Sequence, residues 1–415
     1  MHEIIKLTNG VRIIYEKMPY VRSAAFGIFI NVGSRDEKPS ENGSAHFIEH
    51  MLFKRTSKHS ASELASAMDA IGGQINAYTT RENTCFYARV LDTHLNMAID
   101  ILSEMFFDCA FDEEETDSER GVIYEEIGMY EDTPDDACYE KLMASSFKGA
   151  LGRPVLGKHA TLSKMSGASL REYKEKHYAA ENIIISLCGN FEDSHLRLIS
   201  EKFSALDKVK QANVRKADYT THVSVKRKKT EQNQFCLAFP SSTISHDDRF
   251  AMNLMSTILG GGVSSRLFQN IREKYGLCYS IYSFQTSFED TGIVSVATAV
   301  NKETEMKALS LIGDELRKLK SDGVEAEELQ RAKEQAKSSL VMGLESTNSR
   351  MLKLGNSLLA LGTCLSTDEI IRRYDAVTRE EILKLAQSRF DFSLMSLSAL
   401  GKTDSAENYL KALGL

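Results

Sequence analysis

Short apolar runs and helically spaced apolar positions alternate along the first half of the chain. A hairpin-type turn at Asn9-Gly10 separates two short apolar strands, 4–7 and 11–15. Residues 24–32 and 182–187 are apolar runs rich in β-branched side chains, which predicts strands buried on both faces. Further strands are predicted over 74–80 and 84–90, and helices from Ser44 and over 60–71, 95–107 and 113–147. This order of elements indicates an α+β fold.

The second half repeats the pattern of the first. The features that recur are the capping boxes that begin at Ser169 and Thr378, the strands that end at Gly189 and Gly401, the acidic helix starts at 112–114 and 325–328, and the helical segments 45–53 and 251–259. Each pair is offset by about 210 residues. We therefore predict a tandem repeat of two similar α/β-sandwich domains, each a mostly antiparallel sheet covered by helices. The predicted boundaries are 1–215, a linker over 216–230, and 231–415.

Composition narrows the class of protein. The chain has 415 residues, of which 42% are hydrophobic and 26% charged, and its net charge of −7 argues against a nucleic-acid partner. It contains no apolar run long enough for a membrane span and no signal-peptide core at its N-terminus. Seven cysteines without a Cys-x-x-Cys pair favour reduced thiols and a cytoplasmic location. The basic run 226–229 is interpreted as a solvated edge or linker.

The segment His46-Phe47-Ile48-Glu49-His50 carries the candidate chemistry. On a helix, residues four apart point in similar directions, so His46 and His50 can share one tetrahedral metal ion, and Zn²⁺ favours imidazole ligands. Glu49 lies on the edge of the same face, where it can reach a metal-bound water as a general base. This order inverts His-Glu-x-x-His and is a zinc-peptidase signature. The alternative is a helix with two partly buried histidines and a solvated glutamate.

The helix predicted after Glu113 offers a third ligand. One stripe of this helix holds Glu119, Val122, Ile123, Glu126, Ile127 and Tyr130. Because a buried carboxylate without a partner is unfavourable, two carboxylates on an otherwise apolar face call for a cation. Glu126 would be the ligand, and Glu119 would orient a histidine or the ligand itself. The alternative places one or both carboxylates at the edge of the stripe, in water. The corresponding helix of the second half, at 251–256, contains no histidine, so we expect no zinc site there.

These segments resemble the pitrilysin and insulinase-type inverzincins, especially the bacterial and mitochondrial processing-peptidase branch. The resemblance runs through nearly the whole chain and includes 43–51 (Gly-Ser-Ala-His-Phe-Ile-Glu-His-Met), 76–79, 119–126, 259–262, 265–268 and 272–280. Where the family often has Phe-Lys-Gly-Thr after the zinc helix, this chain has Phe53-Lys54-Arg55-Thr56. The difference affects a loop residue and no ligand.

The resemblance implies a role for each matching residue. It implies one Zn²⁺ per chain held by His46, His50 and Glu126, with Glu49 as the general base and Glu119 supporting a ligand. It also implies that the strand Asn76-Ala77-Tyr78 is the edge on which a peptide substrate adds as a further β-strand. Arg272 and Tyr279 match a pair that contacts substrate near the scissile carbonyl. In related architectures this pair comes from the half that faces the zinc domain, so we predict a clam-like homodimer in which the facing chain supplies Arg272 and Tyr279.

The sequence thus predicts a zinc-dependent endopeptidase that hydrolyses oligopeptides or short unfolded segments inside a closed chamber, with no nucleic-acid or membrane partner. Its alternative is a non-catalytic structural or regulatory subunit of a processing-peptidase-like complex. Obligate pairing with a second, different chain also stays open. The presence of the metal-site residues together with Arg272 and Tyr279 in one chain favours the enzyme.

Overall fold

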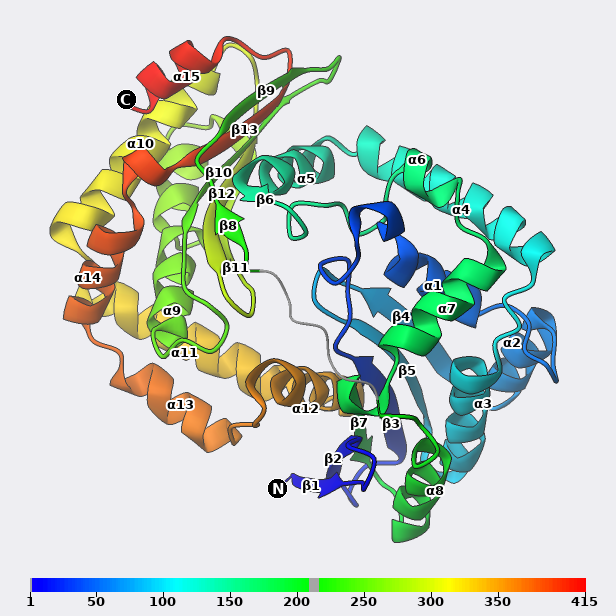
Figure 1. Ribbon diagram of the computed structural model, residues 1–415. Coiled ribbons are helices and arrows are strands. Elements are labelled where there is room, and N and C mark those ends of the chain that lie inside the picture. Colours follow the sequence, from blue (N-terminus) through cyan, green and yellow to red (C-terminus); the bar gives the residue numbers. More distant parts are fainter. Residues whose placement is uncertain (1, 209–215) are drawn as a thin grey trace. The chain divides into compact units, whose positions relative to one another are not determined.

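The computed structural model describes residues 2–208 and 216–415, which form two compact units. Unit 1 consists of Met1–Ile127, Arg153–Arg215 and Val341–Ser366, and unit 2 of Gly128–Gly152, Lys216–Leu340 and Thr367–Leu415. Each unit therefore combines segments that are far apart in the sequence (Figure 1). Residues 209–215, at the end of the predicted N-terminal domain, lie outside the described residues. The domain boundaries predicted from the sequence stay a prediction.

Unit 1 is built on a six-stranded sheet. Its strands are β1 (Glu3–Lys6), β2 (Arg12–Lys17), β3 (Ser23–Ile30), β4 (Gln74–Thr79), β5 (Thr84–Leu91) and β7 (Ile183–Gly189), in the spatial order β1-β2-β7-β3-β5-β4. Its helices are α1 (Ser44–Leu52), α2 (Ala61–Ala70), α3 (Leu95–Asp108), α4 (Glu113–Asp132, in unit 1 as far as Ile127), α6 (His159–Leu162), α7 (Gly167–His177), α8 (Asp193–Phe203), α12 (Thr347–Leu361), and the 3-10 helices η1 (Pro39–Glu41), η2 (Asp92–His94) and η3 (Ala180–Asn182). The hairpin predicted at Asn9-Gly10 is confirmed as the antiparallel pair β1–β2.

Unit 2 is built on a five-stranded sheet. Its strands are β9 (Val223–Arg227), β10 (Asn233–Pro240), β11 (Cys278–Ser287), β12 (Gly292–Val300) and β13 (Ser396–Gly401), in the order β11-β12-β10-β13-β9, and the short strands β6 (Phe147–Lys148) and β8 (Asp218–Tyr219) pair separately. Its helices are α5 (Pro134–Ser146), α9 (Arg249–Gly260), α10 (Glu305–Asp322), α11 (Ala326–Gly343, in unit 2 as far as Leu340), α13 (Thr367–Ala376), α14 (Arg379–Arg389), α15 (Ala406–Ala412), the 3-10 helix η5 (Phe392–Leu394) and the π-helix η4 (Phe268–Lys274).

The two sheets confirm the predicted repeat. In unit 1, β2 runs parallel to β7, and β7, β3, β5 and β4 then follow as antiparallel neighbours. In unit 2, β9 runs parallel to β13, and β13, β10, β12 and β11 follow in the same way. Both sheets are thus mostly antiparallel, and β4 and β11 occupy the same edge position. Unit 1 differs by the added strand β1.

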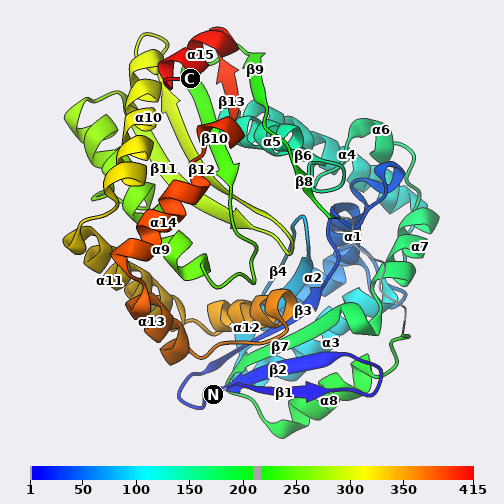
Figure 2. The ribbon, with the colours of Figure 1, turned by 60° about the vertical axis from the view of Figure 1, so that its left-hand side comes forward.

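Each sheet is covered on one face by a helix from the other half of the sequence. In unit 1, residues that alternate along β3 face opposite sides, so Phe26 joins the core beneath α1 and α3 whereas Phe29 packs under α12. Figure 2 shows α12 on one side of β2, β3 and β7, and α3 and α8 on the other. In unit 2, α5 covers β10 and β13 through Cys138 and Leu142. The hydrophobic pattern of the chain does not predict this exchange.

Two helix boundaries differ from the predicted ones. The helix predicted over 113–147 is wrong, because α4 ends at Asp132 and α5 begins at Pro134. Proline lacks the N–H that a continuous helix needs, and it disfavours helical backbone at the preceding residue. The predicted capping box at Ser169 is also wrong. Helix α7 begins three residues earlier, where Ser166 caps it by accepting the N–H of Ser169. The capping box at Thr378 is confirmed.

All seven cysteines are free thiols. Among the described ranges, no helix combines the length and the apolar character that crossing a membrane requires.

Helix α12 approaches the sheet so closely that a methyl group has no room at Gly355, since a Cβ there would lie 2.3 Å from the Phe29 ring. We expect Gly355→Ala to lower the free energy of unfolding by about 1–3 kcal/mol, because overpacking outweighs the helix propensity that alanine adds. Gly121→Ala in α4 is the matched control, because no atom lies within 4 Å of that Cβ. Thermal and urea unfolding of both variants would check this. A melting temperature of Gly355→Ala at or above that of the wild type would contradict the close packing.

Candidate metal centre

Helix α1 presents His46, Glu49 and His50 toward one side, as the sequence spacing predicts. His46 is buried and His50 is partly exposed, and their ring centroids lie 4.6 Å apart. The helix is short and largely buried: Phe47, Ile48 and Met51 on it belong to the core of unit 1. Because α1 is packed in this way, the two imidazoles have little freedom to move apart.

Helix α4 brings Glu126 to the same point. Glu126 Oε2 lies 3.5 Å from His46 Nε2 and 3.4 Å from His50 Nε2. One ligand atom from each of these residues lies within 4.8 Å of the others, which is compatible with a shared ion. Among residues 2–208 and 216–415, this is the one group of three or more His, Cys, Asp or Glu side chains so arranged. The structure therefore brings the predicted ligand set together.

Glu119 contacts one of the candidate ligands, His50, from the side opposite Nε2. Its Oε1 atom lies 2.8 Å from His50 Nδ1, and its Oε2 atom contacts Lys54 Nζ. A hydrogen bond at Nδ1 directs the lone pair of Nε2 toward Glu126, where a metal would bind. Of the two predicted positions for Glu119, the structure places it beside a histidine, buried against the core.

The apolar stripe predicted for α4 is narrower than expected. Thr116, Glu119, Ile123 and Ile127 are buried, as on one helix face, but Val122 is 50% exposed and Tyr130 is 39% exposed. Glu119, Ile123 and Glu126 follow one another at intervals of three or four residues, so they lie on the helix face that packs against the core. Val122 lies at the exposed margin of that face.

The pKa values of the two imidazoles show which charge this site favours. Burial lowers the pKa of His46 to about 4, so this ring is neutral at pH 7. Burial also acts to lower the pKa of His50, but the contacts with Glu119 and Glu126 outweigh it and raise this pKa to about 9. The two carboxylates thus favour a positive charge between them.

This donor set fits zinc. Glu126 Oε2 is buried without a hydrogen-bond partner among the described residues, although it faces both Nε2 atoms. Two imidazole nitrogens and one carboxylate oxygen are a donor set of zinc hydrolases, which leave a further position open. The groups present therefore match the ion that the sequence motif predicts.

Glu49 lies beside the ligands and makes a different contact. Its Oε2 atom accepts a hydrogen bond of 2.5 Å from Thr79 Oγ1 on β4. Burial raises the pKa of Glu49, and the hydrogen bond from Thr79 opposes that rise. The hydrogen bond from Thr79 thus fixes this side chain beside the edge strand β4.

Strand β4, which contains the predicted substrate-binding residues, is an edge of the unit 1 sheet. It pairs with β5 on one side, and the N–H of Ala77 donates to Asn76 Oδ1 rather than to a neighbouring strand. The Tyr78 hydroxyl instead hydrogen-bonds with Asn356 on α12. Asn76 and Ala77 are therefore available at the edge, whereas the Tyr78 side chain is committed to α12.

Arg272 and Tyr279 lie together in unit 2. The Arg272 guanidinium is 4.4 Å from the ring centroid of Phe268 and 5.0 Å from that of Tyr279. Arg272 is on the π-helix η4, and Tyr279 is on the edge strand β11 with 78% of its surface exposed. Their role toward a substrate stays a prediction.

Three residues at the site are missing from the sequence analysis as functional groups: Thr79, Lys54 and Glu37. Thr79 lies within the segment 76–79 that carries the family resemblance, and Lys54 occupies a position that agrees with the family's Phe-Lys-Gly-Thr pattern, so the family pattern is the signal that could find both. Glu37 lies in the polar loop before α1, where it accepts hydrogen bonds from the start of the helix. Nothing local in the sequence distinguishes it from the other polar residues of that loop.

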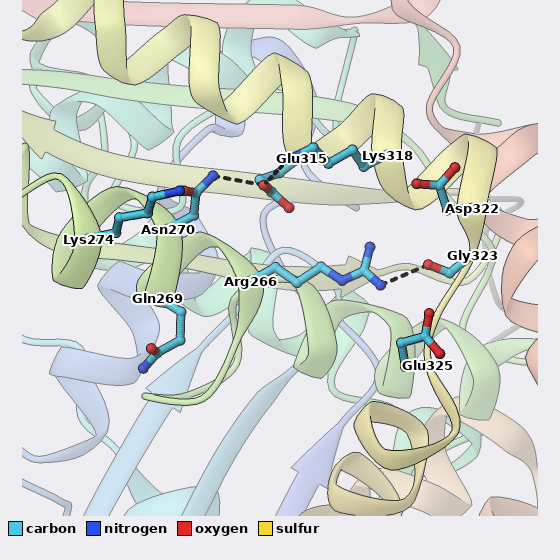
Figure 3. Close-up of a pocket in the computed structure, with 9 residues that line it drawn as sticks. All are labelled: Arg266, Gln269, Asn270, Lys274, Glu315, Lys318, Asp322, Gly323 and Glu325. Atoms are coloured by element: carbon cyan, nitrogen blue, oxygen red, sulfur yellow. Dashed lines mark hydrogen bonds and ion pairs between the residues drawn. The ribbon is translucent and has the colours of Figure 1, made fainter.

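Unit 2 also contains a groove with a volume of about 440 Å³. It is lined by Arg266, Gln269, Asn270, Lys274, Glu315, Lys318, Asp322, Gly323 and Glu325 (Figure 3). Its charged groups are largely engaged with protein partners. Arg266 forms two hydrogen bonds to Glu328, of 2.8 and 2.6 Å, and Glu315 accepts from Asn270 and Lys318. We assign no ligand to this groove.

Comparisons with known proteins agree with the site. Residues 12–159 match the family model described as insulinase (peptidase family M16), and residues 164–336 match the peptidase M16 inactive domain. The zinc protease YmxG of Bacillus subtilis, which is described as uncharacterized, is 42% identical over 96% of this chain and 98% of its own length. A similarly described zinc protease of Streptomyces coelicolor is 40% identical over 92% of this chain and 85% of its own length.

Solved structures show the same fold. A crystal structure of a peptidase M16 inactive domain from Pseudomonas fluorescens matches with a TM-score of 0.91 at 19% identity, covering 97% of this chain and 99% of that one. A protease from Helicobacter pylori matches with a TM-score of 0.88 at 19% identity and the same coverage. The sequence matches and the metal-ligand geometry confirm the family predicted from the motifs. The chain therefore belongs to the insulinase family (peptidase family M16), as a zinc metalloprotease with His46 and His50 in its metal-binding motif.

Proposed function

We propose that this protein is an endopeptidase that hydrolyses oligopeptides or short unfolded segments, with one Zn²⁺ per chain held by His46, His50 and Glu126. The observation that carries the proposal is the position of Glu49. It lies on the ligand helix, is not part of the three-residue ligand group, and is fixed by Thr79 at the open edge of the sheet. This is the position that a general base needs, between the metal and a peptide on β4.

The protein's own residues divide the work of peptide hydrolysis. When bound, zinc supplies Lewis-acid chemistry, which polarises a carbonyl and lowers the pKa of a water. Glu49 takes a proton from the attacking water and donates it to the leaving amine as the C–N bond breaks. The water oxygen then remains on the new carboxyl group. Glu119, which also contacts Lys54, holds His50 in the tautomer that leaves its Nε2 atom free.

Strand β4 supplies the binding edge in this proposal. A peptide that adds to an open sheet edge is bound through its backbone, which makes recognition tolerant of sequence. The contact from the Ala77 N–H to Asn76 Oδ1 is one that an incoming carbonyl oxygen can replace. Asn76 and Ala77 then bind the substrate backbone, and Tyr78 keeps the strand in place through Asn356.

The proposal includes a clam-like homodimer with a closed chamber, in which Arg272 and Tyr279 reach the site of the facing chain. The guanidinium is stacked between two rings, and the phenol is exposed. Both groups can donate hydrogen bonds to a developing oxyanion. A closed chamber would exclude folded proteins by size. Seven free cysteines support a cytoplasmic location.

We expect Glu49→Gln to lower the rate of cleavage of a quenched fluorescent peptide library by about 10²–10⁴-fold, because the general base is lost. Bound zinc should remain at about one per chain, since three ligands are intact. Glu125→Gln, an exposed change on α4, is the control that should keep full activity. Full activity in Glu49→Gln would refute the mechanism. A wild-type chain with neither metal nor cleavage would favour the non-catalytic subunit.

Glu119→Gln removes the charge that holds both His50 and Lys54. We expect the dissociation constant of zinc to rise by about 10–100-fold, as is typical when a residue supporting a metal ligand is changed. Competition with a chromophoric chelator would measure it. Glu114→Gln, in the exposed first turn of the same helix, should leave the constant unchanged. An affinity within twofold of wild type in Glu119→Gln would contradict this supporting role.

Mixing two inactive variants tests whether Arg272 acts in the facing chain. Glu49→Gln and Arg272→Ala should each be nearly inactive alone. After subunit exchange, a mixed dimer holds one intact site, so about a quarter of wild-type activity should return. Sedimentation would confirm the dimer. If exchange occurs and no activity returns, Arg272 does not act across a dimer.

A further inference from the structure

The loop that precedes the metal-binding helix contains a buried acidic side chain that the mechanism does not use. Glu37 is 3% exposed, and Ser34, Arg35 and Asn42 of the same loop are also buried. A fully buried acidic side chain is uncommon unless it has specific partners. The partners of Glu37 therefore indicate what it does.

Helix α1 begins without a side-chain cap of its own. Its N-cap residue is Gly43, with φ of 103°, a backbone conformation that favours glycine. A Cβ at this position would lie 2.8 Å from Leu162 Cδ2 and 2.9 Å from Gly157 Cα. A serine, threonine or aspartate therefore cannot stand here, although the first-turn N–H groups of a helix need acceptors.

Glu37 supplies the missing acceptors from six residues upstream. Its Oε2 atom accepts the N–H of Gly43 at 2.8 Å and Asn42 Nδ2 at 2.9 Å, and its Oε1 atom accepts the N–H of Ala45 at 2.9 Å. A carboxylate at this end of a helix also interacts favourably with the helix dipole. Both oxygens are thus engaged with the residues directly before His46.

The carboxylate is anchored on its other side as well. Asn42, which donates to Glu37, also donates to the carbonyl oxygen of Pro154 at 3.0 Å, and Arg153 donates to the backbone carbonyl oxygen of Glu37. The start of α1 is therefore joined to the segment around residue 154 through the side chains of Asn42 and Arg153. A shift of α1 along its axis would break several of these bonds together.

Burial raises the pKa of Glu37, and the N–H groups of Ala45, Asn42 and Gly43 together with the charge of Arg153 oppose that rise. Both oxygens accept N–H donors, which is the arrangement of an ionised carboxylate. Desolvation of a carboxylate offsets much of what its hydrogen bonds contribute, so a buried charged group is weak evidence for a gain in global stability. These hydrogen bonds instead fix the position of the first turn of α1.

We propose that Glu37 is a positioning residue for the metal site, which fixes the start of α1 and thereby the placement of His46 and His50. The inference rests on the proposed function, since it takes these histidines as zinc ligands. Glu37 itself touches neither the metal position nor a substrate. Its effect is transmitted through the backbone of Gly43 and Ala45.

The test compares zinc affinity with stability in the full-length chain. Glu37→Gln keeps the shape of the side chain but places an N–H₂ group opposite an N–H donor. We expect the zinc dissociation constant, measured by chelator competition, to rise by about 10–100-fold. The melting temperature of the metal-free protein should change by only a few degrees. A purely structural role would lower this temperature and leave zinc affinity unchanged.

Glu41→Gln is the matched control. Glu41 lies in the same loop and accepts the N–H of Lys38 at the start of η1, but none of its hydrogen bonds to the described residues reaches α1, so zinc affinity should be unchanged. Zinc affinity within twofold of wild type in Glu37→Gln would overturn the proposal, whatever its melting temperature.

A second variant decides the matter if Glu37→Gln is unfolded or strongly destabilised. Glu37→Asp keeps the charge and shortens the reach by one methylene group, so it should fold and bind zinc more weakly than wild type. Wild-type affinity in this variant would overturn the inference. A wild-type chain that binds no zinc would instead overturn the proposed function and the inference with it, so the two failures are distinguishable.

Discussion

Two carboxylates on α4 are held against two imidazoles on α1: Glu119 is buried, and the Glu126 oxygen that faces both imidazoles is shielded from water. Burying Glu119 and Glu126 in this way is unfavourable unless positive charge lies between or beside them. Lys54 supplies part of that charge at Glu119, and the pair of imidazoles leaves room for an ion at Glu126. The surrounding structure therefore has to keep α1 and α4 at a fixed distance and orientation relative to each other.

The site was predictable where its geometry is local. In a helix the spacing of His46, Glu49 and His50 determines their relative directions, whatever the helix packs against. Glu126 followed from the principle that a buried carboxylate needs a partner. Thr79 and Glu37 could not be found in this way, because their hydrogen bonds depend on how a strand and a loop return to α1. Such contacts are properties of the tertiary fold.

The fold shows the same limit. Apolar periodicity and the offset of about 210 residues predicted the order of elements and the repeat. Pro134 marks the break between α4 and α5 in the sequence, but the helical spacing of apolar residues alone does not show it. The sequence does not predict which sheet α5 and α12 each cover. An amphipathic pattern shows that a helix buries one face, but it does not show what that face packs against. Both sheets keep the same edge position, and it now carries different residues: Asn76 on β4 and Tyr279 on β11.

The exchange of α5 and α12 has a consequence for biosynthesis. Residues 216–340 are translated before α12 emerges, so one apolar face of the unit 1 sheet stays uncovered while most of unit 2 is made. Domains of a nascent chain ordinarily complete their cores in order from the N-terminus. Here, the core between the unit 1 sheet and α1, α3 and α8 can form from Val11 to Phe203, but the opposite face of that sheet is not covered until α12 has left the ribosome. Release of the ribosome-bound chain before residue 361 would leave that face exposed and prone to aggregation.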